Sequence, residues 1–303
     1  MKKLKIATRG SPLALWQSKY IAGLLLESNP DLKIEFLTIR TSGDKFLGSL
    51  SLAGGKGLFV KEIEECLLNK GADLAVHSMK DLPHVGPSGL EIACILKRGD
   101  PGDSLVTSDG KNIFDLEPRS LIGTSSLRRK AQLLAVRSDL NCKDLRGNVG
   151  TRLLKLQKEE FSALILATSG LKRLGLMKES YFKFDTNMML PAVGQGAIGI
   201  QIRSENNFLR GLVKPLICAD TTASVKAERK MVQLLGGDCG SPIAGFARLS
   251  EREFTLDGLV SDLRGTKILR STYKGNLKEP EILGERVAND PLVKGARSLL
   301  GSE

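Results

Sequence analysis

The sequence is poor in the features that mark several large classes of protein. Aromatic residues make up only 5% of its 303 residues, with one Trp, whereas a protein that binds single-stranded nucleic acid needs rings on which bases can stack. No run of 18 apolar residues occurs, so no segment is predicted to span a membrane. The N-terminus enters a strand-like segment at once, without a secretory or transit signal. We therefore expect a cytoplasmic protein that binds neither membranes nor nucleic acid.

Cysteine and histidine are also scarce. The five cysteines are scattered and odd in number, and none has metal-ligand spacing such as C-x-x-C. We expect no metal site, and the pattern suits a reducing cytoplasm. Cys66 and Cys94 lie among apolar residues and are predicted to be small core side chains. The two histidines, His77 and His84, are predicted to be structural, and no Ser/His/Asp set is present.

Positive charge is what the sequence has in excess. It holds 45 Lys and Arg against 34 Asp and Glu, which gives a formal net charge of +11 and a pI of about 9.4. The hydrophobic content of 41% and the charged content of 26% are ordinary for a globular protein. The excess charge implies an anionic partner, and charge alone admits three kinds: nucleic acid, a membrane surface, or a ligand that carries carboxylates or phosphates.

Strand and helix signals alternate through roughly the first 215 residues. Ser11 followed by Pro12 is typical of a helix start, with serine as N-cap and proline in the first turn. Hydrophobic periodicity predicts strands at 5–8, 34–39 and 74–76 and a second helix at 58–69. This βαβ order predicts a mainly parallel sheet, and hence an α/β fold.

The pattern is repeated along the chain. Segment 6–11 is echoed at 122–129 and segment 73–80 at 163–172, which predicts two similar α/β domains facing a cleft. The tail differs, with a helix at 222–235, a turn at Arg264-Gly265 and helical pieces within 280–300. Strands at 243–248, 254–260 and 267–273 predict an antiparallel meander. The predicted domains are 1–98 plus about 198–216, then 99–197, and a small α+β domain at 217–303.

Two predicted strand-to-helix turns place arginine beside Ser or Thr, at 8–11 and at 124–129. A helix N-terminus offers free N–H groups and a positive dipole end, and arginine adds a fork that fits a carboxylate or phosphate. For one such turn, capping of the helix with a solvated arginine is the simpler interpretation. Because the two turns match in position, a cleft that binds anions explains the pair as well as simple helix capping does.

Three further segments are candidates. Segment 146–152 has small residues between two arginines, which predicts either a loop against an anion or an exposed basic loop. Segment 54–57 lacks the spacing of a phosphate-binding loop, and a mobile flap is the better interpretation. At 76–83 a buried strand delivers Ser78, Lys80 and Asp81 to the cleft. A carboxylate there can exchange a proton or stabilise a cation, although the motif alone also fits a surface turn.

Cys239 is flanked by glycines and followed by Pro242, so it is predicted to lie on a loop. Its sulfur is a potential nucleophile where nearby cations favour the thiolate. A surface thiol on a turn is the alternative that this loop alone favours.

Taken together, seven segments in order closely resemble the porphobilinogen deaminase (hydroxymethylbilane synthase) family. The segments are 7–17, 54–59, 77–81, 123–129, 146–152, 191–197 and the Cys239 loop. The resemblance implies a transferase that condenses four porphobilinogen molecules head to tail into hydroxymethylbilane and releases four ammonia, in haem and chlorophyll biosynthesis. It also implies two domains similar to periplasmic binding proteins, a monomer, and a downstream uroporphyrinogen-forming enzyme that takes the product.

The resemblance further implies a dipyrromethane cofactor, made from two substrate units and attached to Cys239 by a thioether, with Asp81 as the catalytic carboxylate. The implied cofactor contacts are Cys239, Lys80, Ser126, Arg128, Arg129, Arg152, Ser78 and Asp81. The implied substrate contacts are Arg9, Ser11, Arg146, Arg152, Arg173, Gln195 and Lys56. Each pyrrole ring carries two carboxylates, and a cleft rich in arginine binds them and screens their repulsion.

Two residues depart from many members of that family. Asp238 precedes Cys239 where many relatives have Gly, and Leu52 stands where some have a lysine. A non-catalytic two-domain protein that binds anions is the alternative function, because it needs the arginines but neither Cys239 nor Asp81. A nucleic-acid binder comes third, since the basic charge supports it while the few aromatic residues do not.

Overall fold

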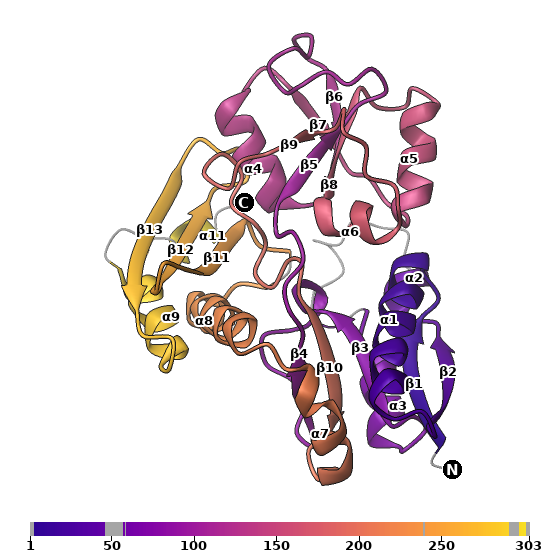
Figure 1. The fold of residues 1–303 in the computed structure, drawn as a ribbon. Coiled ribbons are helices and arrows are strands. Elements are labelled where there is room, and N and C mark those ends of the chain that lie inside the picture. Colours follow the sequence, from indigo (N-terminus) through magenta and orange to yellow (C-terminus); the bar gives the residue numbers. More distant parts are fainter. Residues whose placement is uncertain (1–2, 46–56, 58, 239, 291–296, 301–303) are drawn as a thin grey trace.

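The computed structural model describes residues 3–45, 57, 59–238, 240–290 and 297–300, which form three domains, each with its own sheet (Figure 1). Domain 1 contains a five-stranded sheet in the order β2-β1-β3-β10-β4. Its strands are β1 (Lys3–Arg9), β2 (Lys33–Ile39), β3 (Leu74–Ser78), β4 (Leu90–Ile95) and β10 (Ile198–Arg203). Its helices are α1 (Pro12–Ser28), α2 (Ser42–Lys45), α3 (Lys61–Leu68) and α7 (Asn207–Val213), with one-turn 3-10 helices at Met79–Asp81 and Lys214–Leu216.

Domain 2 contains a second five-stranded sheet, in the order β7-β6-β8-β5-β9. Its strands are β5 (Asp103–Val106), β6 (Leu121–Gly123), β7 (Asn141–Lys143), β8 (Ala163–Ala167) and β9 (Phe182–Lys183). Its helices are α4 (Leu127–Val136), α5 (Val149–Gln157) and α6 (Thr168–Arg173). Apolar residues of β6 and β8, such as Ile122 and Ile165, are fully buried against the helices.

The two sheets have the same topology, strand for strand, which confirms the prediction of two similar α/β domains. The prediction of a mainly parallel sheet is confirmed for both: four of the five strands run in one direction, and one strand, β10 in domain 1 and β5 in domain 2, runs against them. β1 pairs in parallel with β2 and β3, but β10 runs antiparallel to β3 and β4, and β5 runs antiparallel to β8 and β9. The physical reason is that β5 and β10 each enter a sheet from the other domain, so they run against their neighbours.

The C-terminal domain contains an antiparallel meander of β11 (Ile243–Ser250), β12 (Glu253–Ser261) and β13 (Ile268–Gly275), as predicted. Helices α8 (Ala219–Leu235) and α9 (Pro280–Asn289) pack together beside this sheet, and α11 spans Arg297–Leu300 (Figure 1). Met231, Leu256 and Val287 are fully buried where helices and sheet meet. We propose the domain boundaries given above for the folded chain, because each sheet takes all its strands from one of those three parts.

Local signals located the start of α1 but not that of α3, and α8 begins at Ala219 rather than at 222 as predicted. Ser11 caps α1 by accepting a hydrogen bond from the Ala14 N–H, with Pro12 in the first turn, as predicted. The helix predicted at 58–69 instead begins at Lys61. Gly57 has φ +74°, and its carbonyl accepts from the N–H groups of Val60 and Lys61, so a turn occupies the expected first residues.

Two connecting segments join domains 1 and 2 and lie side by side. The N–H of Gly99 in one donates to the carbonyl of Gly196 in the other (3.0 Å). A β-carbon added to Gly196 would stand 2.7 Å from the Gly99 oxygen, so only glycine permits this approach. Arg98 forms a buried ion pair with Glu228 of α8, through two hydrogen bonds of 2.6 and 2.9 Å. The C-terminal domain is thereby fastened to the connection between the other two.

None of the helices among the described residues is long and apolar enough to cross a lipid bilayer. The described residues also contain no group of three or more His, Cys, Asp or Glu side chains placed to hold a metal ion.

Candidate active site

The candidate site begins at the carboxyl ends of β1 and β3, where a cavity of about 60 Å³ opens. Arg9 ends β1 and Ser11 lies in the turn after it, while Ser78 ends β3 and Asp81 lies in the turn that follows, and all four line the cavity. Carboxyl ends of strands in α/β sheets are where such folds bind ligands. The structure therefore brings these four predicted residues together.

Asp81 is exposed at the end of a one-turn 3-10 helix that is held rigidly. Met79 in this turn is buried, and its N–H donates to the Ala197 carbonyl (3.0 Å). The preceding Ser78 is held by Gln17, whose Nε2 donates to the serine Oγ (2.8 Å). The turn thus fixes the backbone that presents the Asp81 carboxylate.

Lys80 projects toward domain 2, where its Nζ donates to Oε1 of Gln195 (3.4 Å). Burial lowers the pKa of Lys80 to about 8. The negative charges of Asp81 and Asp103 oppose this fall, and the positive charges of Arg129 and Arg128 add to it. The ammonium group of Lys80 thus lies among other cations, and a ligand carboxylate bound there would relieve the repulsion between these positive charges.

Arg128 and Arg129, in the first turn of α4, are both buried and share the carboxylate of Asp103. Nη2 of Arg128 donates to Asp103 Oδ2 (2.8 Å), and Nη2 of Arg129 donates to Oδ1 (2.7 Å). Burial alone would raise the pKa of Asp103, but the two guanidinium groups hold it well below its usual value. Neither arginine is solvated. The alternative interpretation of this turn, in which it only caps a helix and leaves its arginines in solvent, is therefore wrong.

Arg146 lies on the loop after β7, and Arg152 lies on helix α5, which follows that loop. Asn148 caps α5 by accepting from the Thr151 N–H (3.0 Å), and Nε of Arg152 donates to the Gly147 carbonyl (2.7 Å). Burial lowers the pKa of Arg152 to about 10. The charges of Arg129 and Arg146 lower it further, while Asp81 raises it. Arg152 is therefore close enough to groups of both domains to interact with them electrostatically.

Ser11 and Ser126 occupy matching positions and both cap helices. Ser11 Oγ accepts from the Ala14 N–H (3.3 Å), and Ser126 Oγ accepts from the Arg129 N–H (3.4 Å). The expectation of capping is confirmed for both turns. Their contacts with cofactor or substrate stay a prediction.

Gln195 and Arg173 stand at the domain connection. Gln195 is completely buried, and its Nε2 donates to the Pro101 carbonyl (2.6 Å) and to Asp103 Oδ1 (3.0 Å). Arg173 is half-buried, and its Nη2 donates to the Gly196 carbonyl (2.6 Å). Burial lowers the pKa of Arg173. Their predicted role as substrate contacts stays a prediction.

Cys239, Lys56 and Leu52 lie outside the described residues. The segment before Cys239 is described: α8 ends at Leu235 with Gly236 in the left-handed conformation (φ +75°). The Asp238 carboxylate accepts from the Gly240 N–H and the Ser241 hydroxyl, both at 2.9 Å. The acidic residue beside Cys239 is therefore engaged in a local turn.

Asp103 is the site residue that the sequence did not reveal. It stands in a Gly- and Pro-containing segment, 99–103, which is typical of a loop. The one signal was an acidic residue at the head of a strand. In the structure this strand is Asp103–Val106, and all of its residues are buried. A buried carboxylate needs a cation nearby, and the two adjacent arginines of α4 were available to pair with it.

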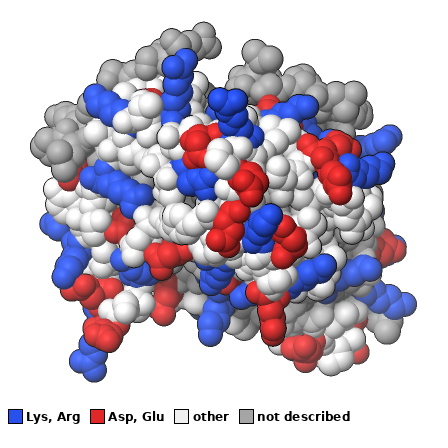
Figure 2. Space-filling model, turned by 90° about the horizontal axis from the view of Figure 1, so that it is seen from above, with Lys and Arg blue, Asp and Glu red and all other residues white. Residues whose placement is uncertain are grey.

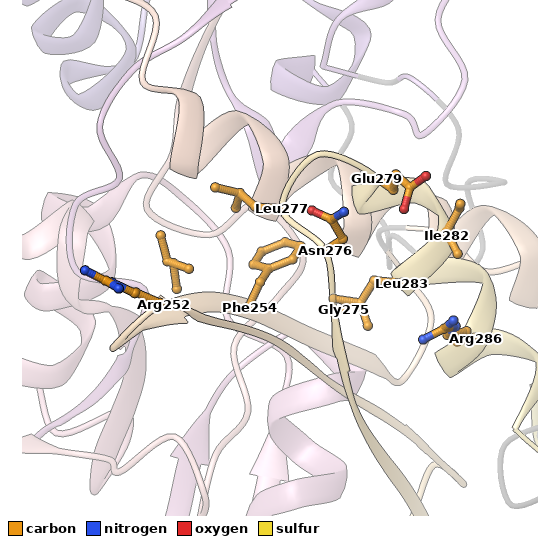
Figure 3. Close-up of a pocket in the computed structure, with 10 residues that line it drawn as sticks. Arg252, Phe254, Gly275, Asn276, Leu277, Glu279, Ile282, Leu283 and Arg286 are labelled. Carbon is orange, nitrogen blue, oxygen red and sulfur yellow. The ribbon is translucent and has the colours of Figure 1, made fainter.

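A larger cavity, about 670 Å³, lies elsewhere, in the C-terminal domain between the β11–β12 turn, the end of β13 and the start of α9 (Figure 3). Phe254 and Leu283 lie buried at its base, and Arg252 and Arg286 stand at opposite ends. None of the predicted site residues lines it. Size therefore does not locate the chemistry in this molecule.

The charge of the outer surface is mixed where Figure 2 shows it. Lys and Arg side chains are interspersed with Asp and Glu over this face, without a continuous basic stripe. Nucleic-acid-binding domains cluster their cations on one face, and this view offers no such footprint.

The donor set around Asp81 fits a ligand rich in carboxylates. Lys80, Arg129 and Arg152 bring three cations from three segments to one region. In addition, Nε of Arg128 is buried without a hydrogen-bond partner among the described residues. Guanidinium and ammonium groups of this kind bind carboxylates with charge-assisted hydrogen bonds. The residues present therefore suit the propionate and acetate groups of a dipyrromethane.

Comparison with known proteins agrees with this geometry. Residues 4–210 match the family model described as "Porphobilinogen deaminase, dipyromethane cofactor binding domain", and residues 222–292 match "Porphobilinogen deaminase, C-terminal domain". The porphobilinogen deaminase of Vesicomyosocius okutanii is 45% identical over 300 residues, 99% of each chain. That of Acidithiobacillus ferrooxidans is 46% identical over 298 residues, 98% of this chain and 97% of the relative.

Solved structures of other proteins are less similar. The benzoate-bound effector domain of BenM covers 71% of this chain and 90% of its own, with 11% identity and a TM-score of 0.42. A periplasmic binding protein from Salmonella typhimurium covers 71% and 92%, with 10% identity and a TM-score of 0.40. At these TM-scores the likenesses carry no conclusion. On the sequence matches, which span nearly its whole length, the chain belongs to the porphobilinogen deaminase family.

Proposed function

We propose that Asp81 is the catalytic carboxylate of this porphobilinogen deaminase, and that Cys239 carries its dipyrromethane cofactor. The enzyme joins four porphobilinogen molecules head to tail into hydroxymethylbilane and releases ammonia, a step of tetrapyrrole biosynthesis. Each addition removes an amine from one pyrrole and forms a carbon–carbon bond to the next. The protein must therefore stabilise a cation on a pyrrole ring and hold a chain of carboxylates.

One observation carries the proposal for Asp81. Of the described residues that line the cavity at the ends of β1 and β3, Asp81 is the one carboxylate, and cations of both domains interact with it. A fixed negative charge stabilises a cation that forms beside it, because the protein need not reorganise during the reaction.

In this proposal Asp81 has two tasks. Its oxygens accept hydrogen bonds from the pyrrole N–H groups and stabilise the positive charge that develops as ammonia leaves. The same carboxylate then accepts and returns a proton at the reacting ring, which is general acid–base work at a strand end open to the cavity. The bound dipyrromethane supplies the pyrrole carbon that the first substrate ring joins.

The cations bind and screen the carboxylates. We assign cofactor contacts to Ser78, Lys80, Ser126, Arg128, Arg129 and Arg152, and substrate contacts to Arg9, Ser11, Arg146, Arg152, Arg173, Gln195 and Lys56. The buried positions of several of these groups support the assignment, since hydrogen bonds between opposite charges strengthen where water is excluded. Arg9, which stands 4.3 Å from the ring centroid of Phe59, presents its charge to the cavity from a fixed position.

We further propose that the enzyme acts as a monomer in the cytoplasm and passes its product to a uroporphyrinogen-forming enzyme. The free thiols of Cys66, Cys94, Cys142 and Cys218 support a reducing compartment. A non-catalytic anion-binding protein is not favoured, because the chain matches an enzyme family over residues 4–210 and 222–292.

Intact mass spectrometry tests the attachment. We expect the purified chain to carry an adduct of two porphobilinogen units less two ammonia, and Cys239→Ser to lack both the adduct and turnover. Cys94→Ser is the matched control, because it replaces a buried free thiol of domain 1 and should keep the adduct. A full adduct on the Cys239→Ser protein would contradict the assignment.

A further inference from the structure

We propose that Asp103 is a positioning residue for the reaction. Its buried carboxylate holds the guanidinium groups of Arg128 and Arg129 and, through Gln195, the ammonium of Lys80 in one array. The inference rests on the proposed role of these cations as carboxylate contacts. It adds the residue that orients them and sets the charge they present.

The hydrogen bonds of Asp103 use both of its oxygens. Oδ2 accepts from Nη2 of Arg128 (2.8 Å), while Oδ1 accepts from Nη2 (2.7 Å) and Nε (3.1 Å) of Arg129 and from Nε2 of Gln195 (3.0 Å). The side chain of Asp103 is completely buried. A carboxylate with four such donors has one orientation, and it fixes that of its partners.

The far ends of the two arginines are anchored as well. Nη1 of Arg128 donates to the Leu190 carbonyl (2.7 Å), and Nη1 of Arg129 donates to the Ile165 carbonyl (2.9 Å). Each guanidinium is therefore clamped between a backbone carbonyl and the carboxylate of Asp103. Groups clamped in this way can meet a ligand without first reorganising, and displacements of about 1 Å in such arrays cost as much as 100-fold in rate.

Gln195 extends the array to domain 1. Its Nε2 donates to Asp103, and its Oε1 accepts from Nζ of Lys80 (3.4 Å). Lys80 immediately precedes Asp81, so the chain of contacts leads from domain 2 to the residue assigned to the chemistry. The amide suits this position, because it can accept from a cation on one side and donate to an anion on the other.

The charges explain why the carboxylate is needed. Arg128, Arg129 and Lys80 bring three positive charges together, and buried cations without a counter-charge are strongly destabilising. Asp103 offsets one of the three and leaves a positive excess for ligand carboxylates. A fully neutralised cluster would bind them weakly, and an uncompensated one would lose protons or fail to pack.

The test measures the proton affinity of Lys80 directly, by competitive acylation with acetic anhydride and peptide mass spectrometry. Among the described residues, the charged groups that act most strongly on Lys80 are Asp81 on its own turn, Asp103 of β5, and Arg128 and Arg129 of α4. In Asp103→Asn one negative charge is lost and the pKa of Lys80 falls below its value of about 8. If it falls by about one unit, the neutral amine at pH 7 rises from about one-tenth to one-half, and acylation quickens roughly fivefold.

Glu228→Gln is the matched control. Glu228 is likewise completely buried and paired through two hydrogen bonds, with Arg98, but it does not face Lys80. It should lower the melting temperature and leave the acylation of Lys80 unchanged. Unchanged acylation in Asp103→Asn, with a lowered melting temperature like that of the control, would overturn the proposal and leave Asp103 a structural residue only.

Asp103→Glu covers the case in which Asp103→Asn does not fold. It keeps the negative charge and moves it by one methylene, so the acylation of Lys80 should stay close to wild type while kcat/KM falls about tenfold or more. A wild-type kcat/KM would show that the position of this carboxylate does not matter, and would overturn the proposal. Because acylation does not require turnover, an error in the role of Asp81 would leave that readout unchanged.

Discussion

Domains 1 and 2 place very different residues at one equivalent position of their sheets. β10 begins with Ile198, opposite Ser78 at the end of β3, whereas β5 begins with Asp103, opposite Ala167 at the end of β8. Both positions are buried. In domain 2 this residue is a carboxylate that binds the arginines of the neighbouring turn, whereas in domain 1 the equivalent residue is apolar.

The second difference lies at the ends of β3 and β8. β3 continues into the turn Met79–Asp81, which ends on a carboxylate, whereas β8 continues into α6, which begins with Thr168 and Ser169. Domain 1 therefore presents its acid to the cavity, and domain 2 keeps its acid buried under two arginines. One repeated scaffold thus places an exposed carboxylate at the cavity in one copy and a buried, paired carboxylate in the other.

The largest expected difference in stability is that between the variants Arg129→Leu and Arg9→Leu. Arg129→Leu leaves Asp103 buried with half of its charge partners, which should cost about 3–5 kcal/mol of unfolding free energy and impair cofactor assembly. Arg9 is only partly buried and stacks on Phe59, so Arg9→Leu should cost about 0.5–1 kcal/mol. Urea unfolding of both variants measures the difference. Equal losses would show that the two turns are used alike.

The loss of stability in acid should likewise distinguish the buried carboxylate Asp103 from an exposed one. The pKa of Asp103 lies below its usual value, so the unfolded chain takes up a proton near pH 4 while the folded chain resists it. Stability from Asp103 is therefore present at neutral pH and is lost as the pH falls below about 4, by about 1.4 kcal/mol per pH unit. Asp103→Asn should remove this slope from the unfolding free energy, whereas exposed Asp115→Asn should keep it.

The sequence predicted features that depend on neighbouring residues better than features that depend on residues far apart in the chain. The cap Ser11 was predicted, and capping was one of the two interpretations of the turn that holds Ser126, because a cap acts on the next turn of its own helix. The start of helix 58–69 was misplaced by the left-handed Gly57, whose conformation is not encoded by hydrophobic periodicity. Cys239 was singled out on its loop, but its neighbours in space are not described.

Asp103 was missed because its position depends on the direction of β5. In an all-parallel sheet the start of β5 would lie at the edge away from the helix N-termini. Since β5 is antiparallel to β8, its first residue instead lies beside the carboxyl end of β8, under Arg128 and Arg129. That reversal follows from the crossing between domains, which no local pattern records.

The smallest effect concerns salt. Arg9 lines a cavity that is open to solvent, so its attraction for substrate carboxylates should weaken as ionic strength rises, and KM should increase several-fold between low and physiological salt. Arg9→Leu should flatten this dependence. Arg128→Leu should leave it nearly unchanged, because its partner Asp103 is shielded from ions by burial. Steady-state kinetics across a salt series measures the salt dependence of KM in both variants. A wild-type KM that does not change with salt would contradict the expected role of Arg9.

The most direct measurement of the central claim compares Asp81→Asn with Asp81→Glu in single-turnover assays, using protein whose intact mass shows the adduct. Asn keeps the size and one acceptor but loses the charge, while Glu keeps the charge and moves it by one methylene. If Asp81 stabilises the pyrrole cation, Asn should lose about 10²–10⁴ in rate and Glu far less. Both should stay folded, because the side chain is exposed. Near wild-type turnover by cofactor-bearing Asp81→Asn would contradict the mechanism.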